Sequence, residues 1–344
     1  MKTELLLPPG AMLWDGSAVC GGHSAESRAQ WVLNNDASVH CIEDARERIM
    51  CEFPNAFAWQ ATDSILSQSE LEWFDTHGFL VLRNAVPTSA VNRALRAIYA
   101  HLGAHGAEPS LLQQYNAQSW VPQLAAESVA TASLLEVLRH VQPAVRSLVG
   151  RSVPQCAIPQ VALRFPQPLA DASQPAGCGR EPVLPHELWH GMHIDGLATA
   201  DNAVQPGSLH SFSLLAGCAL TDQMVENAGN LVVLPGSHVQ MSHVLRSQAQ
   251  AGVPLGPSEE SELWGLGQYV PAECTEWGST PLQLRLSAGD VVLCHYLLAH
   301  TVAPNLAPTP RANLYWRVAH ADHAAPASLV DPRKDFDSLH GRVG

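Results

Sequence analysis

The sequence has few lysines and little charge of either sign. Charged residues make up 15% of the 344 residues, the formal net charge is −13, and the only lysines are Lys2 and Lys334. Proteins that bind nucleic acids gather Lys and Arg into a basic stripe, because phosphate contacts supply most of their affinity. The sequence contains no such stripe. We therefore expect no nucleic-acid partner.

Long apolar runs and closely spaced cysteine pairs are also absent. A helix that spans a bilayer needs about 20 apolar residues, and no run approaches that length. The segment from Met1 to Asp15 carries Glu4 and two prolines and lacks the apolar region of a signal peptide. None of the eight cysteines forms a C-x-x-C pair, which is typical of buried thiols in a reducing compartment. We expect a cytoplasmic protein without a membrane partner.

The length and the apolar content of 46% indicate one large globular domain. Residues 1–65 show no repeat, although Val39–Phe53 has the pattern of an amphipathic helix. We interpret 1–65 as an N-terminal extension that packs on a main domain at 66–325, with a tail at 326–344.

The main domain begins with helical signals. Ser67-x-x-Glu70 is a capping-box pattern, and Gly78 stands where a helix-ending glycine belongs. The run Phe79–Leu82 then reads as a strand. Two further helices are predicted, one from Pro87 to about Leu102 and one from Leu134 to Val149 with an interruption at Pro143.

From about residue 153 the sequence consists of short β-prone runs bounded by Pro, Gly, Asp and Asn. Many short runs of this kind predict antiparallel strands in a sandwich or jelly-roll, so the fold class is mainly β with flanking helices. A Pro- and Gly-rich segment, Gln167–Pro185, is interpreted as a loop or lid, and Val244–Thr280 as a long insertion. The predicted strands are Ile158–Phe165, Gly191–Asp195, Phe212–Leu220, Asn230–Leu234, Leu282–Leu286, Val291–His295 and Ala312–Val318.

The segment His193-Ile194-Asp195 places an imidazole and a carboxylate two residues apart. On a strand, residues i and i+2 project from the same face, so both groups point into one space. With a more distant histidine they complete a set of two His and one carboxylate, which leaves positions open on iron(II). The His-x-Asp pair alone is a weak signal in a chain with 17 histidines.

A second group of candidate residues lies about a hundred residues further on. Gly289-Asp290 is a turn that begins a strand, and His300 ends the apolar run after it. Three prolines separate His300 from Arg311, so the chain turns and Arg311 can return beside His300. A guanidinium at that place can hold a carboxylate through two hydrogen bonds.

Taken together and in this order, these segments resemble the phytanoyl-CoA dioxygenase family of iron(II)- and 2-oxoglutarate-dependent oxygenases. The resemblance covers roughly residues 66–320. Its parts are Trp73–Leu82, His193–Gly196, Asn227–Leu231 with Pro235–His238, Gly289–Val292, and finally His300, Asn305 and Arg311.

The resemblance implies a double-stranded β-helix core, which is a cupin-like jelly-roll. It implies iron(II) on His193, Asp195 and His300, and 2-oxoglutarate as co-substrate with its distal carboxylate on Arg311. With O2, such an enzyme oxidises a C–H bond of a small molecule, for which a secondary metabolite fits well, and releases succinate and CO2. Related halogenases replace the carboxylate ligand with Gly or Ala, so Asp195 favours hydroxylation.

Further contacts to the co-substrate are implied by the same resemblance. Gln160 lies on the strand before the expected lid, where the family often has a polar contact to the co-substrate. Family members often have a small hydroxyl residue two positions after the distal His, but Val302 stands there in this sequence. Thr301 or Tyr315 then serves as the second contact.

The substrate pocket has weaker candidates. Strand alternation places Trp189 on the face of His193, while Phe165 either lines the pocket or belongs to the core. Arg164 binds a substrate carboxylate or forms a surface ion pair. Arg317 alternates onto the face of Arg311, and we expect a structural ion pair for it.

Two other interpretations of the sequence are weighed against the oxygenase. A cupin-like module could bind a ligand without turnover, although it has no need of the complete ligand set. The run His186-Glu187-Leu188-Trp189-His190 matches the H-E-x-x-H signature of zinc peptidases. That chemistry requires a helix, and the flanking Pro185 and Gly191 leave room for about one turn.

Overall fold

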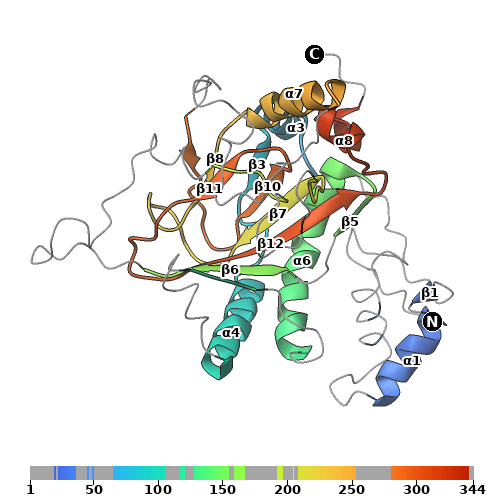
Figure 1. Ribbon diagram of the computed structural model, residues 1–344. Coiled ribbons are helices and arrows are strands. Elements are labelled where there is room, and N and C mark those ends of the chain that lie inside the picture. Colours follow the sequence, from blue (N-terminus) through green and yellow to red (C-terminus); the bar gives the residue numbers. More distant parts are fainter. Residues whose placement is uncertain are drawn as a thin grey trace, which may run out of the picture.

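A computed structural model describes most of the predicted main domain (Figure 1). The predicted helix at Val39–Phe53 lies outside the described residues except for Ala45 and Ile49, which are both helical, and the predicted lid at Gln167–Pro185 lies wholly outside them. None of the described helices is long and apolar enough to cross a membrane. The described residues are 19–20, 22–35, 45, 49, 65–105, 117–120, 128–154, 159–166, 192–196, 204, 208–252 and 280–340.

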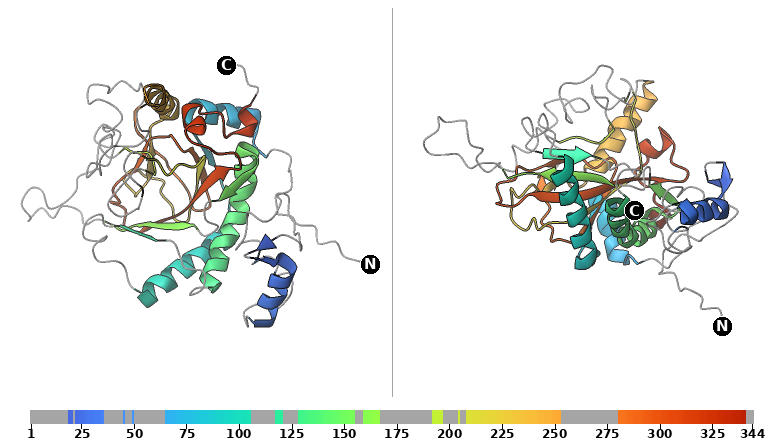
Figure 2. Two further views of the ribbon diagram at one scale, coloured as in Figure 1. Left: turned by 45° about the vertical axis from the view of Figure 1, so that its right-hand side comes forward. Right: turned by 90° about the horizontal axis from the view of Figure 1, so that it is seen from below.

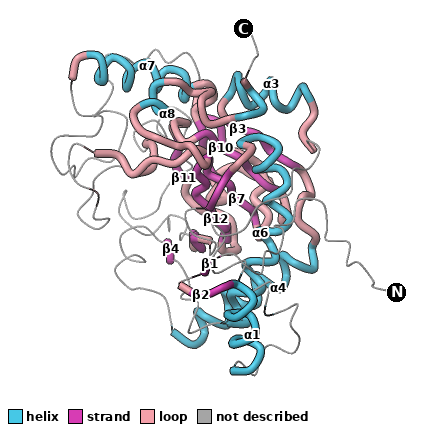
Figure 3. Tube along the Cα trace, turned by 90° about the vertical axis from the view of Figure 1, so that its right-hand side faces the viewer, coloured by secondary structure: helices cyan, strands magenta, loops and turns pink. Residues whose placement is uncertain are grey.

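The helices lie around the strands, as the tube view shows (Figure 3). The predicted capping box is present, because the Ser67 side chain accepts from the Glu70 amide and the Glu70 carboxylate accepts from the Ser67 amide. Gly78 ends this helix in the left-handed conformation, at φ 76°. The helices are α1 (Ala25–Asn35), α3 (Gln68–His77), α4 (Thr88–His105), α6 (Ser128–Val149), α7 (Ser237–Gln250) and α8 (Ala327–Val330).

Two predictions about helices were wrong. Helix α6 begins at Ser128 and continues through Pro143, which lacks the amide that would bond the Arg139 carbonyl. Its apolar residues on both sides of the proline belong to one buried cluster, and this packing outweighs the lost bond. The predicted insertion at Val244–Thr280 does not begin at Val244, because helix α7 continues to Gln250 with Met241 and Leu245 fully buried; residues 253–279 lie outside the described residues.

Among the described residues, the strands form two larger antiparallel sheets and one small one. The large sheet has the order β3-β10-β7-β12-β6-β4, with β5 also paired to β12, and the second sheet has the order β11-β8-β9. Two sheets of this kind are the jelly-roll that the sequence predicts. The strands are β1 (Val19–Cys20), β2 (His23–Ser24), β3 (Phe79–Leu82), β4 (Ala117–Trp120), β5 (Ser152–Pro154), β6 (Gln160–Arg164), β7 (Leu214–Ala219), β8 (Leu231–Val233), β9 (Leu282–Gln283), β10 (Val291–His295), β11 (His300–Val302) and β12 (Arg311–His320).

Strand β12 shows how the core is divided. Leu314 and Trp316 belong to the buried cluster that includes α3, α4 and α6, and Tyr315 between them belongs to the cluster that includes β8 and α7. This alternation follows from the two-residue period of a strand. The large sheet therefore packs its outer face on helices α4 and α6, which lie side by side (Figure 2), and turns its inner face toward the second sheet.

The turn at Gly289-Asp290 begins β10 as predicted. Gly289 has φ 95°, and a Cβ atom there would lie 2.5 Å from the Val86 carbonyl oxygen. The Asp290 carboxylate is buried and accepts from the backbone amides of Asn84 and Ser287. It therefore ties β10 to the end of the neighbouring strand β3.

The predicted strand at Gly191–Asp195 was wrong over the residues that can be compared, 192–195. His193 forms an isolated bridge with His300, with amide-to-carbonyl distances of 3.0 and 2.9 Å. Gly196 then turns the chain at φ 83°, where a Cβ atom would lie 2.3 Å from the His210 carbonyl oxygen. The turn limits the pairing to this bridge, which still places His193 beside the start of β11.

Candidate metal centre

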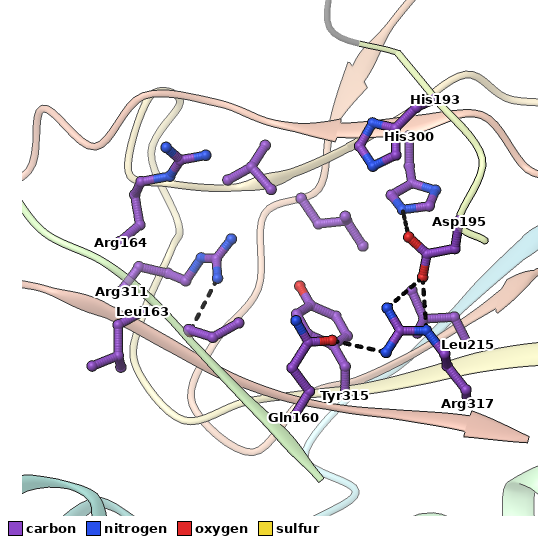
Figure 4. A pocket seen from close by; sticks show the side chains of 13 residues that line it. Gln160, Leu163, Arg164, His193, Asp195, Leu215, His300, Arg311, Tyr315 and Arg317 are labelled. Atoms are coloured by element: carbon purple, nitrogen blue, oxygen red, sulfur yellow. Dashed lines mark hydrogen bonds and ion pairs between the residues drawn. The ribbon is translucent and has the colours of Figure 1, made fainter. Parts of the chain in front are cut away.

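Three side chains meet between the sheets, at the start of β11. His193, Asp195 and His300 each offer one ligand atom, and these atoms lie within 4.8 Å of one another. The His193–His300 bridge brings the two imidazole rings to a centroid distance of 4.7 Å. Figure 4 shows the three side chains converging at one side of a cavity.

The backbone orients the ring of His300. Its Nδ1 donates to the Leu298 carbonyl oxygen at 3.0 Å, which leaves Nε2 facing Asp195 Oδ1 at 3.7 Å. Burial alone would lower the pKa of His300, but Asp195 and the Leu298 carbonyl outweigh burial and raise it. A metal ion binds neutral imidazole and would take the place of this proton.

Asp195 divides its two carboxylate oxygens between two partners. Oδ2 accepts from Arg317 Nε at 3.1 Å and from Arg317 Nη2 at 2.8 Å, while Oδ1 faces His300. Burial alone would raise the pKa of Asp195, but His300, Arg317 and His193 together lower it well below its usual range. The group is therefore a carboxylate at neutral pH, with Oδ1 available as a ligand.

Arg311 lies at the other side of the same cavity and is buried. Its Nε donates to the Gly229 carbonyl oxygen at 2.7 Å, its Nη1 donates to the Ala162 carbonyl oxygen at 3.2 Å, and burial lowers its pKa. Among the residues that the structure describes, no acidic side chain forms an ion pair with it. A buried cation held only by carbonyl oxygens favours the arrival of an anion.

The close approach of residue 229 to strands β6 and β12 explains why this residue is a glycine. Gly229 has φ 74°, and a Cβ atom would lie 3.1 Å from Arg311 Cβ and 3.3 Å from Arg164 Cβ. Arg164 and Arg311 are directly opposite each other on β6 and β12. Two cations therefore line the same end of the cavity.

The cavity has a volume of about 200 Å³. Ala162, Leu215, Leu231 and Val302 are apolar residues of its lining, and Gln160 and Tyr315 are polar ones. In the close view, Gln160 and Tyr315 lie between the metal-binding candidates and Arg311 (Figure 4).

The predicted co-substrate contacts are only partly brought together. Gln160 Oε1 accepts from Arg317 Nη1 at 2.9 Å, and the Tyr315 hydroxyl accepts from Asn313 Nδ2 at 2.9 Å. Thr301 is not part of the lining, whereas its neighbour Val302 is. Alternation along β11 turns the Thr301 side chain away, so the structure favours Tyr315.

The residues predicted to line the substrate pocket differ in where the structure places them. Arg164 lines the cavity. Phe165 does not, because it packs against the cluster on the helix side of the large sheet. Trp189, together with the run His186–His190 that resembles a zinc-peptidase signature, lies outside the described residues. His238 is the second residue of α7 and does not cap it, because the N-cap residue is Gly236.

The ion pair expected for Arg317 is formed with Asp195. Alternation with Arg311 along β12 signals the face on which Arg317 lies, but nothing in the sequence signals its partner. Leu298 was missed entirely, because a residue that acts through its carbonyl oxygen carries no side-chain signature.

Comparisons with known proteins agree with the resemblance found in the sequence. A family model described as phytanoyl-CoA dioxygenase (PhyH) matches residues 74–313. A search of curated proteins finds no match.

The chain is also similar to solved structures, each with a TM-score below 0.5, which supports no conclusion about activity. One is the non-heme alpha ketoglutarate dependent carbocyclase SnoK from nogalamycin biosynthesis, at 16% identity over 74% of this chain and 85% of that chain, with a TM-score of 0.48. Another is HygX from Streptomyces hygroscopicus with nickel and 2-oxoglutarate bound, at 19% identity over 75% of this chain and 89% of that chain, with a TM-score of 0.46. A third is EctD from S. alaskensis with 2-oxoglutarate and 5-hydroxyectoine, at 20% identity over 76% of this chain and 79% of that chain, with a TM-score of 0.42.

Proposed function

The chain belongs to the phytanoyl-CoA dioxygenase family, because the family match covers more than half of its length, and we propose that it is an iron(II)- and 2-oxoglutarate-dependent oxygenase of a small molecule. One observation carries the proposal. Three metal-binding candidates and a buried arginine without an acidic partner among the described residues face each other across a single cavity. We propose residues 66–325 as the catalytic domain and 1–65 as an extension that packs on it.

The donor set suits iron(II). His193 and His300 offer imidazole nitrogens and Asp195 offers a carboxylate oxygen, which is the facial set of non-haem iron oxygenases. His300 Nε2 and Asp195 Oδ1 are 3.7 Å apart. Two ligands at about 2.1 Å from one metal ion lie roughly 3 to 4 Å apart, so both atoms can reach the same ion. The remaining positions of that ion would face the cavity.

The cavity suits 2-oxoglutarate, which carries one carboxylate beside its keto group and another at its far end. Arg311 would bind the far carboxylate, because its buried guanidinium has no acidic partner among the described residues. The Tyr315 hydroxyl and Gln160 would supply polar contacts to the co-substrate between the metal and Arg311. Leu231 and Val302 would line the cavity with apolar surface that excludes water.

When bound, iron(II) and 2-oxoglutarate supply the activation of O2 that oxidises a C–H bond, with release of succinate and CO2. The chain supplies binding and orientation. His193, Asp195 and His300 hold the metal to one side, and Arg311 fixes the direction of the co-substrate. Asp195 occupies the place that chloride needs in related halogenases, so we propose hydroxylation rather than halogenation.

We propose that the substrate is a small molecule, with a secondary metabolite as its class. The cavity of about 200 Å³ has room for the co-substrate and for the reacting part of such a molecule. Arg164 lines the cavity beside Arg311 and would bind a polar or anionic group of the substrate.

Conversion of 2-oxoglutarate to succinate in the presence of iron(II) and O2 tests the proposal. The wild-type chain should release succinate, and Asp195→Ala should reduce the release to background because the anionic ligand is lost. Arg311→Ala should raise the KM for 2-oxoglutarate by about 10- to 100-fold, the worth of a charge-assisted hydrogen bond. Full turnover by Asp195→Ala, or an unchanged KM in Arg311→Ala, would remove the residue concerned from its role.

The mass of the oxidised substrate distinguishes the reaction types. Hydroxylation adds one oxygen atom, whereas desaturation and ring formation remove two hydrogen atoms. A halogenated product would contradict the role that we give to Asp195.

A further inference from the structure

Arg317 is the third arginine of the cavity, and it lies on the metal side. We propose that Arg317 is a positioning residue that keeps Asp195 a one-oxygen ligand of the metal and so preserves the open positions that the co-substrate needs. This inference rests on the proposed function, because it presumes a metal ion at His193, Asp195 and His300. It deepens that function by assigning a role to a residue outside the ligand set.

The contacts of Asp195 support this role. Arg317 Nε and Nη2 both donate to Oδ2, at 3.1 and 2.8 Å, so the guanidinium occupies the side of the carboxylate that faces away from His300. Oδ1 remains directed at His300 Nε2, at 3.7 Å. Two charge-assisted bonds to one oxygen make that oxygen a poor second ligand.

Arg317 is itself held from two further directions. Its Nη1 donates to Gln160 Oε1 at 2.9 Å, and its guanidinium carbon lies 5.8 Å from the centroid of the Phe212 ring. These contacts come from strand β6 and from the segment before β7, so the guanidinium does not depend on Asp195 alone for its orientation. An arginine fixed in this way can impose an orientation on the carboxylate.

The pair contributes little to stability by attraction alone. The Arg317 side chain is 35% exposed, and ion pairs screened by solvent are worth little. The main effect of the Arg317–Asp195 pair is on the coordination of the metal. A carboxylate that gave both oxygens would occupy a position that 2-oxoglutarate needs, since this co-substrate binds through two atoms. Removal of Arg317 should therefore weaken co-substrate binding even where the metal still binds.

Removal of Asp195 would leave Arg317 facing an empty place beside the metal. The guanidinium would still be held by Gln160 and would lie next to a doubly charged ion. A small carboxylate should then bind at that place. Formate is the natural probe, because it carries the carboxylate of Asp195 without the chain.

Anaerobic cobalt(II) binding tests the inference without turnover, since the visible bands of cobalt(II) report the number and geometry of its ligands. The variants are Arg317→Met and, as a matched control, Arg333→Met. Arg333 also pairs with an aspartate through Nε and Nη2, but it bonds both oxygens, Asp75 Oδ1 at 2.9 Å and Oδ2 at 2.8 Å, and its side chain is 39% exposed. Neither residue of that pair lines the cavity.

We expect Arg317→Met to change the cobalt(II) bands and to weaken 2-oxoglutarate binding to the cobalt(II) form by about 10- to 100-fold. Arg333→Met should leave both unchanged. The affinity for the metal does not decide the test, because two effects of the substitution oppose each other. Removal of the positive charge of Arg317 favours metal binding, whereas loss of the orientation of Asp195 disfavours it. Unchanged bands and unchanged 2-oxoglutarate affinity in Arg317→Met would overturn the inference and leave the proposed function standing. A folded wild-type chain that binds no cobalt(II) would overturn both.

Formate rescue provides a second test that a purely structural role would not pass. We expect formate to restore wild-type-like cobalt(II) bands to Asp195→Ala and not to the double variant Asp195→Ala with Arg317→Met. Arg317→Lys should show partial rescue in the same background, because Lys keeps the charge and loses the fork geometry. Equal rescue with and without Arg317 would contradict the inference.

Discussion

Two of the histidine clusters in the described part of the chain are built in opposite ways. At the metal centre, His193 and His300 face a carboxylate and a cavity. The inner histidine pair, His238 and His295, has a ring distance of 5.0 Å, and His295 packs against the rings of Phe74 and Phe336. Both clusters contain buried imidazoles, so burial does not identify a metal ligand.

The hydrogen-bond partners separate the two clusters. His295 Nε2 donates to the Pro332 carbonyl oxygen at 2.8 Å, and its Nδ1 accepts from the Leu297 amide at 2.9 Å, so neither nitrogen is left for a metal. His300 uses only Nδ1 on the backbone and directs Nε2 at Asp195. A ligand histidine is thus recognised by one nitrogen fixed and the other aimed at a carboxylate.

The electrostatic environment follows the same division. Burial lowers the pKa of His238 to about 4 and that of His295 to about 3, whereas Asp195 raises the pKa of His300. The inner pair is therefore neutral at pH 7 and serves packing. The metal-centre histidine is held in a site that attracts positive charge.

Substitutions in the two clusters should have opposite effects, with activity lost at the metal centre and stability lost at the inner pair. We expect His193→Ala to abolish 2-oxoglutarate turnover with little loss of stability, because His193 is only half-buried. His295→Phe should leave two buried backbone groups unpaired and lower the free energy of unfolding by about 2 to 5 kcal/mol. Succinate release and urea unfolding measure the two effects.

The contrast would be contradicted by the reverse pattern. If His295→Phe lost its turnover at unchanged stability, the inner pair would have a chemical role. A fully active His193→Ala would remove His193 from the ligand set.

Acid should unfold the protein in part through the inner pair. Folding depresses the pKa values of His238 and His295 below the value of about 6.5 for an unfolded histidine. Their contribution to stability is thus fully present above about pH 6.5 and is lost as the pH falls toward 4, because the unfolded chain binds more protons in this window. The loss should reach a few kcal/mol.

Urea unfolding at pH 7 and pH 5 measures this effect, with His238→Gln as the matched variant. Gln can still donate to the Asp75 carbonyl oxygen that His238 Nε2 contacts, but it does not titrate. The difference in unfolding free energy between the two pH values should be smaller in the variant. Equal differences would show that His238 does not carry the effect.

Two glycines refine the comparison, because Gly78 lies against the inner histidine pair and Gly229 lies against the arginines at the other side of the metal-centre cavity. Gly78 has φ 76°, and its Cβ position lies 2.5 Å from His238 Nδ1, whereas Gly229 has φ 74° and lies against Arg311. Replacement of either by Ala should cost about 1 to 3 kcal/mol in unfolding free energy. Only Gly229→Ala should also raise the KM for 2-oxoglutarate. A raised KM in Gly78→Ala at full folding would show that the clusters are coupled.

The features that depend on local pattern could be predicted from the sequence. The Ser67 capping box, the β3 strand and the β12 alternation all result from spacing that each segment carries in itself. The convergence of His193, Asp195 and His300 could be predicted because the family resemblance supplied the distant partner.

Features decided by packing between distant segments could not be predicted. Helix α6 continues through Pro143 because its apolar face is buried against the sheet. The β-bridge replaces a strand at His193 because Gly196 turns the chain there against His210. Arg317 forms its ion pair with Asp195 because the bridge places Asp195 beside it. The spacing of residues within either segment does not predict this contact.

Anaerobic absorbance of the protein with iron(II), and then with 2-oxoglutarate added, tests the central claim most directly. We expect a visible metal-to-ligand charge-transfer band that appears on addition of 2-oxoglutarate and is lost in His193→Ala and in Arg311→Ala. The absence of the band from a folded, iron-loaded wild-type protein would contradict the oxygenase assignment, and zinc binding at His186 and His190 would then be measured.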